Sequence, residues 1–215
     1  MFDATARRLL DRPLCAAARL IDRRHVTPNR LTMLGLATGL ASAATAAGQL
    51  WWWALGLWLF SRAMDGLDGP LARRRRATLD PTDPARDGEA GGFLDITADF
   101  AVYGATVVGV AIGATAQYDA DWLPFLLVLV AYYVNGSAFL AFSSIAERTG
   151  RQREDGRSLS FLGGLAEGTE TIAVHSLWLV VPAHAGLIAT VWAAVVGVSA
   201  AQRIVAGFRD LSGPD

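Results

Sequence analysis

The stretch Met64-Asp65-Gly66-Leu67-Asp68-Gly69-Pro70-Leu71-Ala72-Arg73 ends an apolar run that begins at residue 51. A second stretch, Gly91-Gly92-Phe93-Leu94-Asp95-Ile96-Thr97-Ala98-Asp99, opens another apolar run. Residues three or four apart share one face of a helix, so each aspartate pair points one way if these stretches are helical. Ionised carboxylates beside lipid are costly unless a partner compensates them, and four together repel one another. A divalent metal is the simplest partner, because hard cations prefer clustered carboxylate oxygens.

The composition around these aspartates is typical of a membrane protein. Hydrophobic residues make up 53% of the 215 residues, and the mean hydropathy is +0.33. Apolar runs of about 18 residues or more are candidate transmembrane helices. We therefore expect an all-α integral membrane protein that forms a single domain over residues 1–215, with six transmembrane helices. The expected spans are 31–49, 51–70, 92–116, 122–145, 161–181 and 185–208, the fifth being interrupted by Glu167, Glu170 and His175.

The basic residues predict the orientation of the chain. All 19 are arginines, and they gather before the first run, in alternate loops and after the last run. Because cytoplasmic loops carry the excess of basic residues, we expect a multi-pass protein of the inner (plasma) membrane with both termini and all four aspartates on the cytoplasmic side. These arginines suit anionic headgroups or phosphates, so membrane lipids are the expected partners and nucleic acid is not.

Two segments outside the runs have their own patterns. Residues 2–24 alternate apolar and basic positions, which predicts an amphipathic helix on the membrane surface. Residues 74–90 are rich in charges and turn formers, which predicts an irregular cytoplasmic loop. Cys15 is the only cysteine, so an intrachain disulfide is excluded.

Small residues and an arginine accompany the carboxylates. Gly66, Gly69, Ala72 and Gly91 let helices approach closely or let a ligand reach the backbone. Arg73 adds a donor fork that matches phosphate oxygens, and a metal held by carboxylates can polarise a phosphoryl group. The combination points to an anionic phosphate ligand. The alternative is an interfacial cluster in which the aspartates only pair with nearby arginines.

The order Asp-x-x-Asp-Gly-x-x-Ala-Arg followed by Gly-x-x-x-Asp-x-x-x-Asp resembles the signature of the CDP-alcohol phosphatidyltransferases, particularly bacterial inner-membrane members. All eight positions match: Asp65, Asp68, Gly69, Ala72, Arg73, Gly91, Asp95 and Asp99. The resemblance also covers the Thr27–Thr32 entry into the first run and the six-span layout. One departure is the segment 74–90, which is longer than the family usually has and lies beside the expected site. A surface loop absorbs such an insertion at little entropic cost.

The resemblance implies a metal-dependent phosphotransferase of phospholipid biosynthesis. A substituted phosphoryl (phosphatidyl) group would pass from a CDP-linked donor, preferably CDP-diacylglycerol, to the hydroxyl of a small alcohol, and CMP would be released. Two Mg²⁺ or Mn²⁺ ions and a possible homodimer are part of the same implication. Asp65, Asp68 and Asp95 would hold metal, while Asp99 would share a metal and deprotonate the acceptor. The expected CDP-binding residues are Asn29, Thr32, Gly69, Ala72, Arg73 and Gly91, and the expected acceptor-binding residues are Arg148, Arg151, Arg153, Arg157, Glu167 and Glu170.

Other functions remain open at this point. Within the same class, a soluble CDP-alcohol could donate to diacylglycerol. A divalent-cation transporter is an alternative of another class, with the aspartates as its permeation site. That function needs acidic residues along a path to the far side, where only Asp119 and Asp121 occur. A catalytically inactive scaffold is a third alternative, but all four aspartates are retained.

Overall fold

The computed structural model describes residues 3–23, 25–78, 89–149 and 166–213, and all the regular elements within these ranges are helical. The all-α prediction is confirmed for this part of the chain. The elements are α1 (Asp3–Ile21), α2 (Pro28–Ala47), α3 (Trp51–Arg76), α4 (Glu89–Tyr118), α5 (Leu123–Arg148), α6 (Gly168–Val180), the 3-10 helix η2 (Pro182–His184) and α7 (Ala185–Ser212).

Within the described ranges, three segments are long and apolar enough to cross a membrane: Ala90–Tyr118, Leu123–Arg148 and Pro182–Ser212. They coincide with the third, fourth and sixth predicted spans and indicate a membrane-embedded protein. The predicted runs 31–49 and 51–70 fall on α2 and α3, and membrane crossing by these two helices stays a prediction.

The predicted fifth span, 161–181, is only partly helical. Helix α6 has 13 residues, which corresponds to a length of about 20 Å, whereas the hydrocarbon core of a bilayer is about 30 Å thick. Ala166 and Glu167 precede the helix, and residues 161–165 lie outside the described ranges. The polar residues Glu167 and Glu170 therefore sit where the helix begins, not within a long apolar span.

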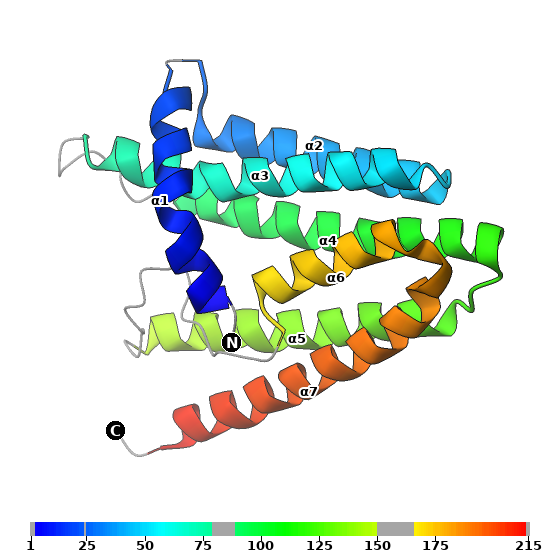
Figure 1. Cartoon of the computed structure of the whole chain (residues 1–215). Helices are drawn as coiled ribbons and strands as arrows, with labels where there is room; N and C mark the ends of the chain where they lie inside the picture. Colours follow the sequence, from blue (N-terminus) through cyan, green and yellow to red (C-terminus); the bar gives the residue numbers. More distant parts are fainter. Residues whose placement is uncertain (1–2, 24, 79–88, 150–165, 214–215) are drawn as a thin grey trace.

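The helices form a bundle in which α2 packs along both α3 and α4, and α5 packs along α7 (Figure 1). Helix α6 contacts α3 and helps to join the two groups. One core of buried side chains runs through α2 to α7, with Trp58, Trp178 and Phe125 among its largest members. The end of α3 and the beginning of α4 lie at the same end of the bundle, where α1 runs across the other helices (Figure 1). The membrane-surface position predicted for 2–24 stays a prediction.

Glycines allow α2 and α4 to approach closely. A Cβ atom built on Gly109 of α4 would lie 2.8 Å from the carbonyl carbon of Ala43 and 2.9 Å from its Cα. A Cβ on Gly113 would likewise collide with the Ala46 carbonyl and with Trp51, whose ring atom would be 2.8 Å away. Small residues at a helix interface permit such backbone contact. The close contacts at Gly109 and Gly113 therefore set the distance between α2 and α4.

The predicted loop 74–90 is shorter in the structure. Helix α3 continues to Arg76, and α4 begins at Glu89, so the prediction was wrong at both ends; residues 79–88 lie outside the described ranges. Arginines at 73–76 form the last turn of α3, where cations interact favourably with the negative end of the helix dipole.

Asp22 links the end of α1 to the end of α3. Its carboxylate accepts hydrogen bonds from Nε of Arg74 at 2.8 Å and from Nε of Arg75 at 3.0 Å. The two arginines lower the pKa of Asp22 below its ordinary value. Arg75 also donates to the Arg23 carbonyl at 2.9 Å. The linker between α1 and α2 is therefore held against α3, close to the sequence motif.

Candidate active site

Helices α3 and α4 bring three of the four motif carboxylates together. Asp65 and Asp68 of α3 and Asp95 of α4 each offer one oxygen, and these three oxygens lie within 4.8 Å of one another. Asp68 is buried, while Asp65 and Asp95 are partly buried. Clustered carboxylate oxygens are a donor set that suits Mg²⁺ and Mn²⁺. The residues present therefore fit a divalent cation.

Thr32 of α2 orients one of these carboxylates. Its hydroxyl donates to Asp68 Oδ2 at 2.5 Å, and both side chains are buried. Hydrogen bonds to ionised acceptors are the stronger ones. The sequence suggested Thr32 as a CDP contact, and that role stays a prediction; the structure shows the hydroxyl supporting Asp68.

Asp99 adjoins this group of three without belonging to it. Its Oδ1 accepts a hydrogen bond from Nη1 of Arg62 at 2.6 Å, and the same nitrogen lies 3.7 Å from Asp65 Oδ2. The Asp99 side chain keeps 30% of its surface exposed, against 5% for Arg62. The four carboxylates are thus unequal, since three lie close enough to share a cation and the fourth is paired with Arg62. Metal binding by Asp99 stays a prediction.

Arg62 was missed by the sequence reasoning, although a signal was present. It is the one arginine within the apolar run 51–70, and an ionisable residue inside a membrane segment is a functional candidate by default. It also precedes Asp65 by three positions and so shares its helix face. The arginines were interpreted as signals of membrane orientation, whereas Arg62 contacts Asp65 and Asp99.

The residues expected to bind CDP lie near these carboxylates in two pairs. A Cβ atom on Gly91 would lie 3.4 Å from Asn29 Oδ1, and one on Gly69 would lie 3.3 Å from Arg73 Nη1. Asn29 and Arg73 are exposed, and Ala72 is partly buried. The absence of a Cβ atom at Gly69 and Gly91 thus lets the polar groups of Arg73 and Asn29 lie close to the backbone.

The expected acceptor residues are described only in part. Arg148 is the exposed last residue of α5, and Glu167 and Glu170 lie at the partly buried beginning of α6. These helix ends lie at the same end of the bundle as the end of α3 (Figure 1). Arg151, Arg153 and Arg157 lie outside the described ranges, and the acceptor role of the whole set stays a prediction.

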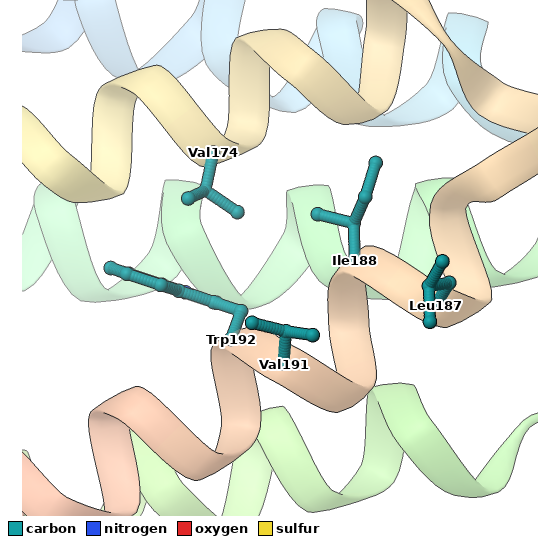
Figure 2. A pocket seen from close by; sticks show the side chains of 5 residues that line it. All are labelled: Val174, Leu187, Ile188, Val191 and Trp192. Atoms are coloured by element: carbon teal, nitrogen blue, oxygen red, sulfur yellow. The ribbon is translucent and has the colours of Figure 1, made fainter.

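A separate apolar groove lies between α6 and α7. Val174 of α6 faces Leu187, Ile188, Val191 and Trp192 of α7 (Figure 2). Its lining is entirely apolar, so it offers no group for proton transfer or for binding phosphate or metal. This groove therefore contributes no residue to the carboxylate cluster or to the expected phosphoryl transfer.

Two known proteins are similar to this chain. The chain is 35% identical over 199 residues to the inner membrane protein YnjF of Escherichia coli strain K12, covering 90% of this chain and 88% of the relative. Its structure resembles the phosphatidylinositol phosphate synthase PgsA1 of Mycobacterium tuberculosis, solved with CDP-DAG bound. The TM-score is 0.69 at 22% identity, over 92% of this chain and 94% of that one, which shows a shared fold.

The family model for CDP-alcohol phosphatidyltransferase matches residues 25–201. This range contains all eight motif positions, the cluster on α3 and α4, and the supporting residues Asn29 and Thr32. The chain belongs to the CDP-alcohol phosphatidyltransferase family.

Proposed function

We propose that this protein transfers a phosphatidyl group from a CDP-linked lipid, CDP-diacylglycerol, to the hydroxyl of a small polar alcohol and releases CMP. The observation that carries the proposal is the convergence of the family motif at one end of the bundle, with Asp65, Asp68 and Asp95 close enough to share a cation. The shared fold with a synthase solved with CDP-DAG bound supports a lipid donor. The small alcohols to test are glycerol phosphate, inositol phosphate and serine.

Different residues of the chain would bind the metal and the CDP moiety. Asp65, Asp68 and Asp95 would hold Mg²⁺ or Mn²⁺, with Asp99 completing a site for a second ion. When bound, such a cation neutralises charge on the phosphate oxygens and makes a nearby alcohol more acidic. Arg73 and Asn29, which lie close to the backbone at Gly69 and Gly91, would orient the CDP moiety.

The transfer balances without a further reactant. The acceptor oxygen attacks the phosphatidyl phosphorus and a new phosphorus–oxygen bond forms. The bond from that phosphorus to the oxygen bridging it to CMP breaks, so CMP leaves with the electron pair. Asp99, at the partly exposed edge of the cluster, accepts the acceptor's proton as general base, which requires hydrogen-bond reach to that hydroxyl.

The arginine distribution supports a cytoplasmic site in the inner membrane, where nucleotides are available. Both termini would lie on that side, and the donor lipid would enter from the bilayer. Arg148, Arg151, Arg153, Arg157, Glu167 and Glu170 are the proposed acceptor contacts.

Release of CMP by the purified protein tests the proposal. The protein in detergent micelles should release CMP from CDP-diacylglycerol with one alcohol of the panel, only with Mg²⁺ or Mn²⁺ present. A second arm of the assay tests the alternative reaction, with a soluble CDP-alcohol as the donor and diacylglycerol as the acceptor. If no donor yields CMP while liposomes containing the protein take up divalent cations, the protein is a transporter and the proposal is wrong.

Asp99→Asn should abolish turnover while CDP binding stays within about threefold of the wild type, because a base acts on the chemical step. The matched control is Asp119→Asn, at an exposed turn at the opposite end of the bundle where φ is 55°. Asparagine tolerates that conformation as aspartate does, so this variant should keep wild-type turnover. Loss of CDP binding in Asp99→Asn would instead make Asp99 chiefly a structural ligand.

A further inference from the structure

The guanidinium of Arg62 is a positive charge that lies against the carboxylate cluster. Arg62 lies in α3 with 8% of its surface exposed. Its guanidinium carbon is 5.1 Å from the ring centroids of both Trp58 and Tyr103. Cation–π contacts of this kind stabilise a desolvated guanidinium. Both ring contacts and the burial restrict the movement of this group, and so the direction of its hydrogen bonds.

The fixed guanidinium is directed at one half of the cluster. Nη1 donates to Asp99 Oδ1 at 2.6 Å and lies 3.7 Å from Asp65 Oδ2, while Nη2 donates to Ser61 Oγ at 3.1 Å. Nε is buried without a hydrogen-bond partner among the described residues, so the polar contacts of this side chain come from its two terminal nitrogens.

A cation at this position has two physical consequences. The hydrogen bond restrains the Asp99 carboxylate, and Asp99 is the group that must reach the acceptor. The positive charge also repels a divalent cation approaching Asp99 and Asp65, and this repulsion is strong where water is scarce. Arg62 lies directly against Asp99 and Asp65, whereas its charge acts on Asp68 and Asp95 only through longer-range electrostatic interaction. Arg62 therefore weakens cation binding most on the Asp99 side of the cluster.

We propose that Arg62 is a positioning residue that orients Asp99 and makes the Asp99 side of the cluster the weaker of two divalent-cation sites. Its catalytic part rests on the proposed function, since it assumes that Asp99 serves the transfer reaction. Its cation-binding part stands on the carboxylate geometry alone.

Binding of Mn²⁺ by the purified protein, followed by calorimetry and by electron paramagnetic resonance, tests the proposal. Arg62→Met removes the charge and keeps an apolar side chain against the two rings. It should tighten the weaker class of Mn²⁺ sites by about tenfold or more, because the repulsion is gone. It should also lower kcat for CMP release by about 100-fold, because Asp99 is no longer oriented.

Mn²⁺ affinity and kcat measured together distinguish a positioning role of Arg62 from unfolding of the site. A variant that merely unfolds the site would bind Mn²⁺ more weakly, whereas tighter binding with slower turnover is the signature of Arg62. The matched control is Arg203→Met, which removes another buried guanidinium, one that lies 5.9 Å from the Phe139 ring centroid. Mn²⁺ binding by this control should stay within about threefold of the wild type, since the lost charge is not part of the cluster.

Arg62→Lys provides a second test if the methionine variant does not fold. Lysine keeps the charge but lacks the planar fork, so Mn²⁺ binding should stay within about threefold of the wild type while kcat still falls by about tenfold or more. Wild-type kcat in Arg62→Lys, or unchanged or weaker Mn²⁺ binding in folded Arg62→Met, overturns the proposal. If the wild type releases no CMP from any donor, the proposed function fails, whereas the Mn²⁺ result still decides the cation-binding part.

Discussion

Gly109→Ala should destabilise the protein, although alanine is the better helix former. Gly109 faces the backbone of α2, where the added methyl group would lie 2.8 Å from the carbonyl carbon of Ala43 and 2.9 Å from its Cα. Carbon atoms in favourable contact are about 3.5–4.0 Å apart. Helices α2 and α4 would therefore have to separate by roughly 0.7 Å or more, or α4 would have to rotate.

The size of the effect follows from a comparison with Gly104→Ala on the same helix. A Cβ on Gly104 would meet nothing within 4 Å, so that variant keeps only the gain in helix propensity, about 1 kcal/mol. Gly109→Ala makes the same gain but adds the cost of overpacking, about 1–3 kcal/mol. The free energy of unfolding of the two variants should therefore differ by about 1–3 kcal/mol, with Gly109→Ala the less stable.

Equilibrium unfolding by SDS in mixed micelles, followed by tryptophan fluorescence, measures this difference. Mn²⁺ affinity provides a second readout, because α4 also carries Asp95, whose carboxylate must stay close to those of α3. Gly109→Ala should bind Mn²⁺ more weakly than Gly104→Ala. Equal free energies of unfolding for the two variants would refute the close approach of α2 and α4. They would also refute the idea that the contacts of Gly109 and Gly113 with α2 set the geometry of the cluster.

Two further predictions concern single hydrogen-bond donors and acceptors. Thr32→Val keeps the shape of the side chain but removes the bond to Asp68; we expect a loss of about 1.5–3 kcal/mol in the free energy of unfolding, together with weaker Mn²⁺ binding in calorimetry. Asp22, whose pKa is lowered by hydrogen bonds from Arg74 and Arg75, should contribute stability that is fully present above about pH 4 and is lost as the pH falls further. The unfolding midpoints of wild type and Asp22→Asn, measured across pH, should therefore differ at neutral pH and converge in acid; a constant difference would contradict this assignment.

Much of the site follows from spacing along the chain. Asp65 and Asp68 are three residues apart, and a helical period alone places them on one face of α3. The small residues and Arg73 beside them pointed to a phosphate ligand and to the family. Local patterns of this kind are readable because helix geometry is regular.

The unequal division of the four carboxylates was not readable in the same way. It depends on how α4 is rotated against α3, and that rotation is set by side-chain packing such as the contacts of Gly109 and Gly113 with α2. Asp95 faces the α3 pair, whereas Asp99 meets Arg62. Contacts between residues 37 positions apart are a property of the packed bundle, and no periodicity within one helix contains them.

The extent of individual helices was also misjudged at charged ends. Charge density over 74–90 indicated a loop, but arginine is a good helix former, and the last turn of α3 extends to Arg76. At α6 the error had the opposite sign, because apolar content suggested a full span where the helix begins only at Gly168. Composition separates lipid-compatible from polar segments better than it locates helix ends.

Helix α2 contributes no carboxylate, yet it packs along both helices that do, supports Asp68 through Thr32 and places Asn29 beside Gly91. The contacts of α2 with both helices therefore support the relative position of the two halves of the motif. Evolution can then lengthen or shorten the segment that joins them in sequence with little effect on the cluster, while the surface of α2 stays under selection. The extra residues between Arg73 and Gly91 are a freedom of this kind, and divergence among relatives should accumulate there before it reaches the faces of α2.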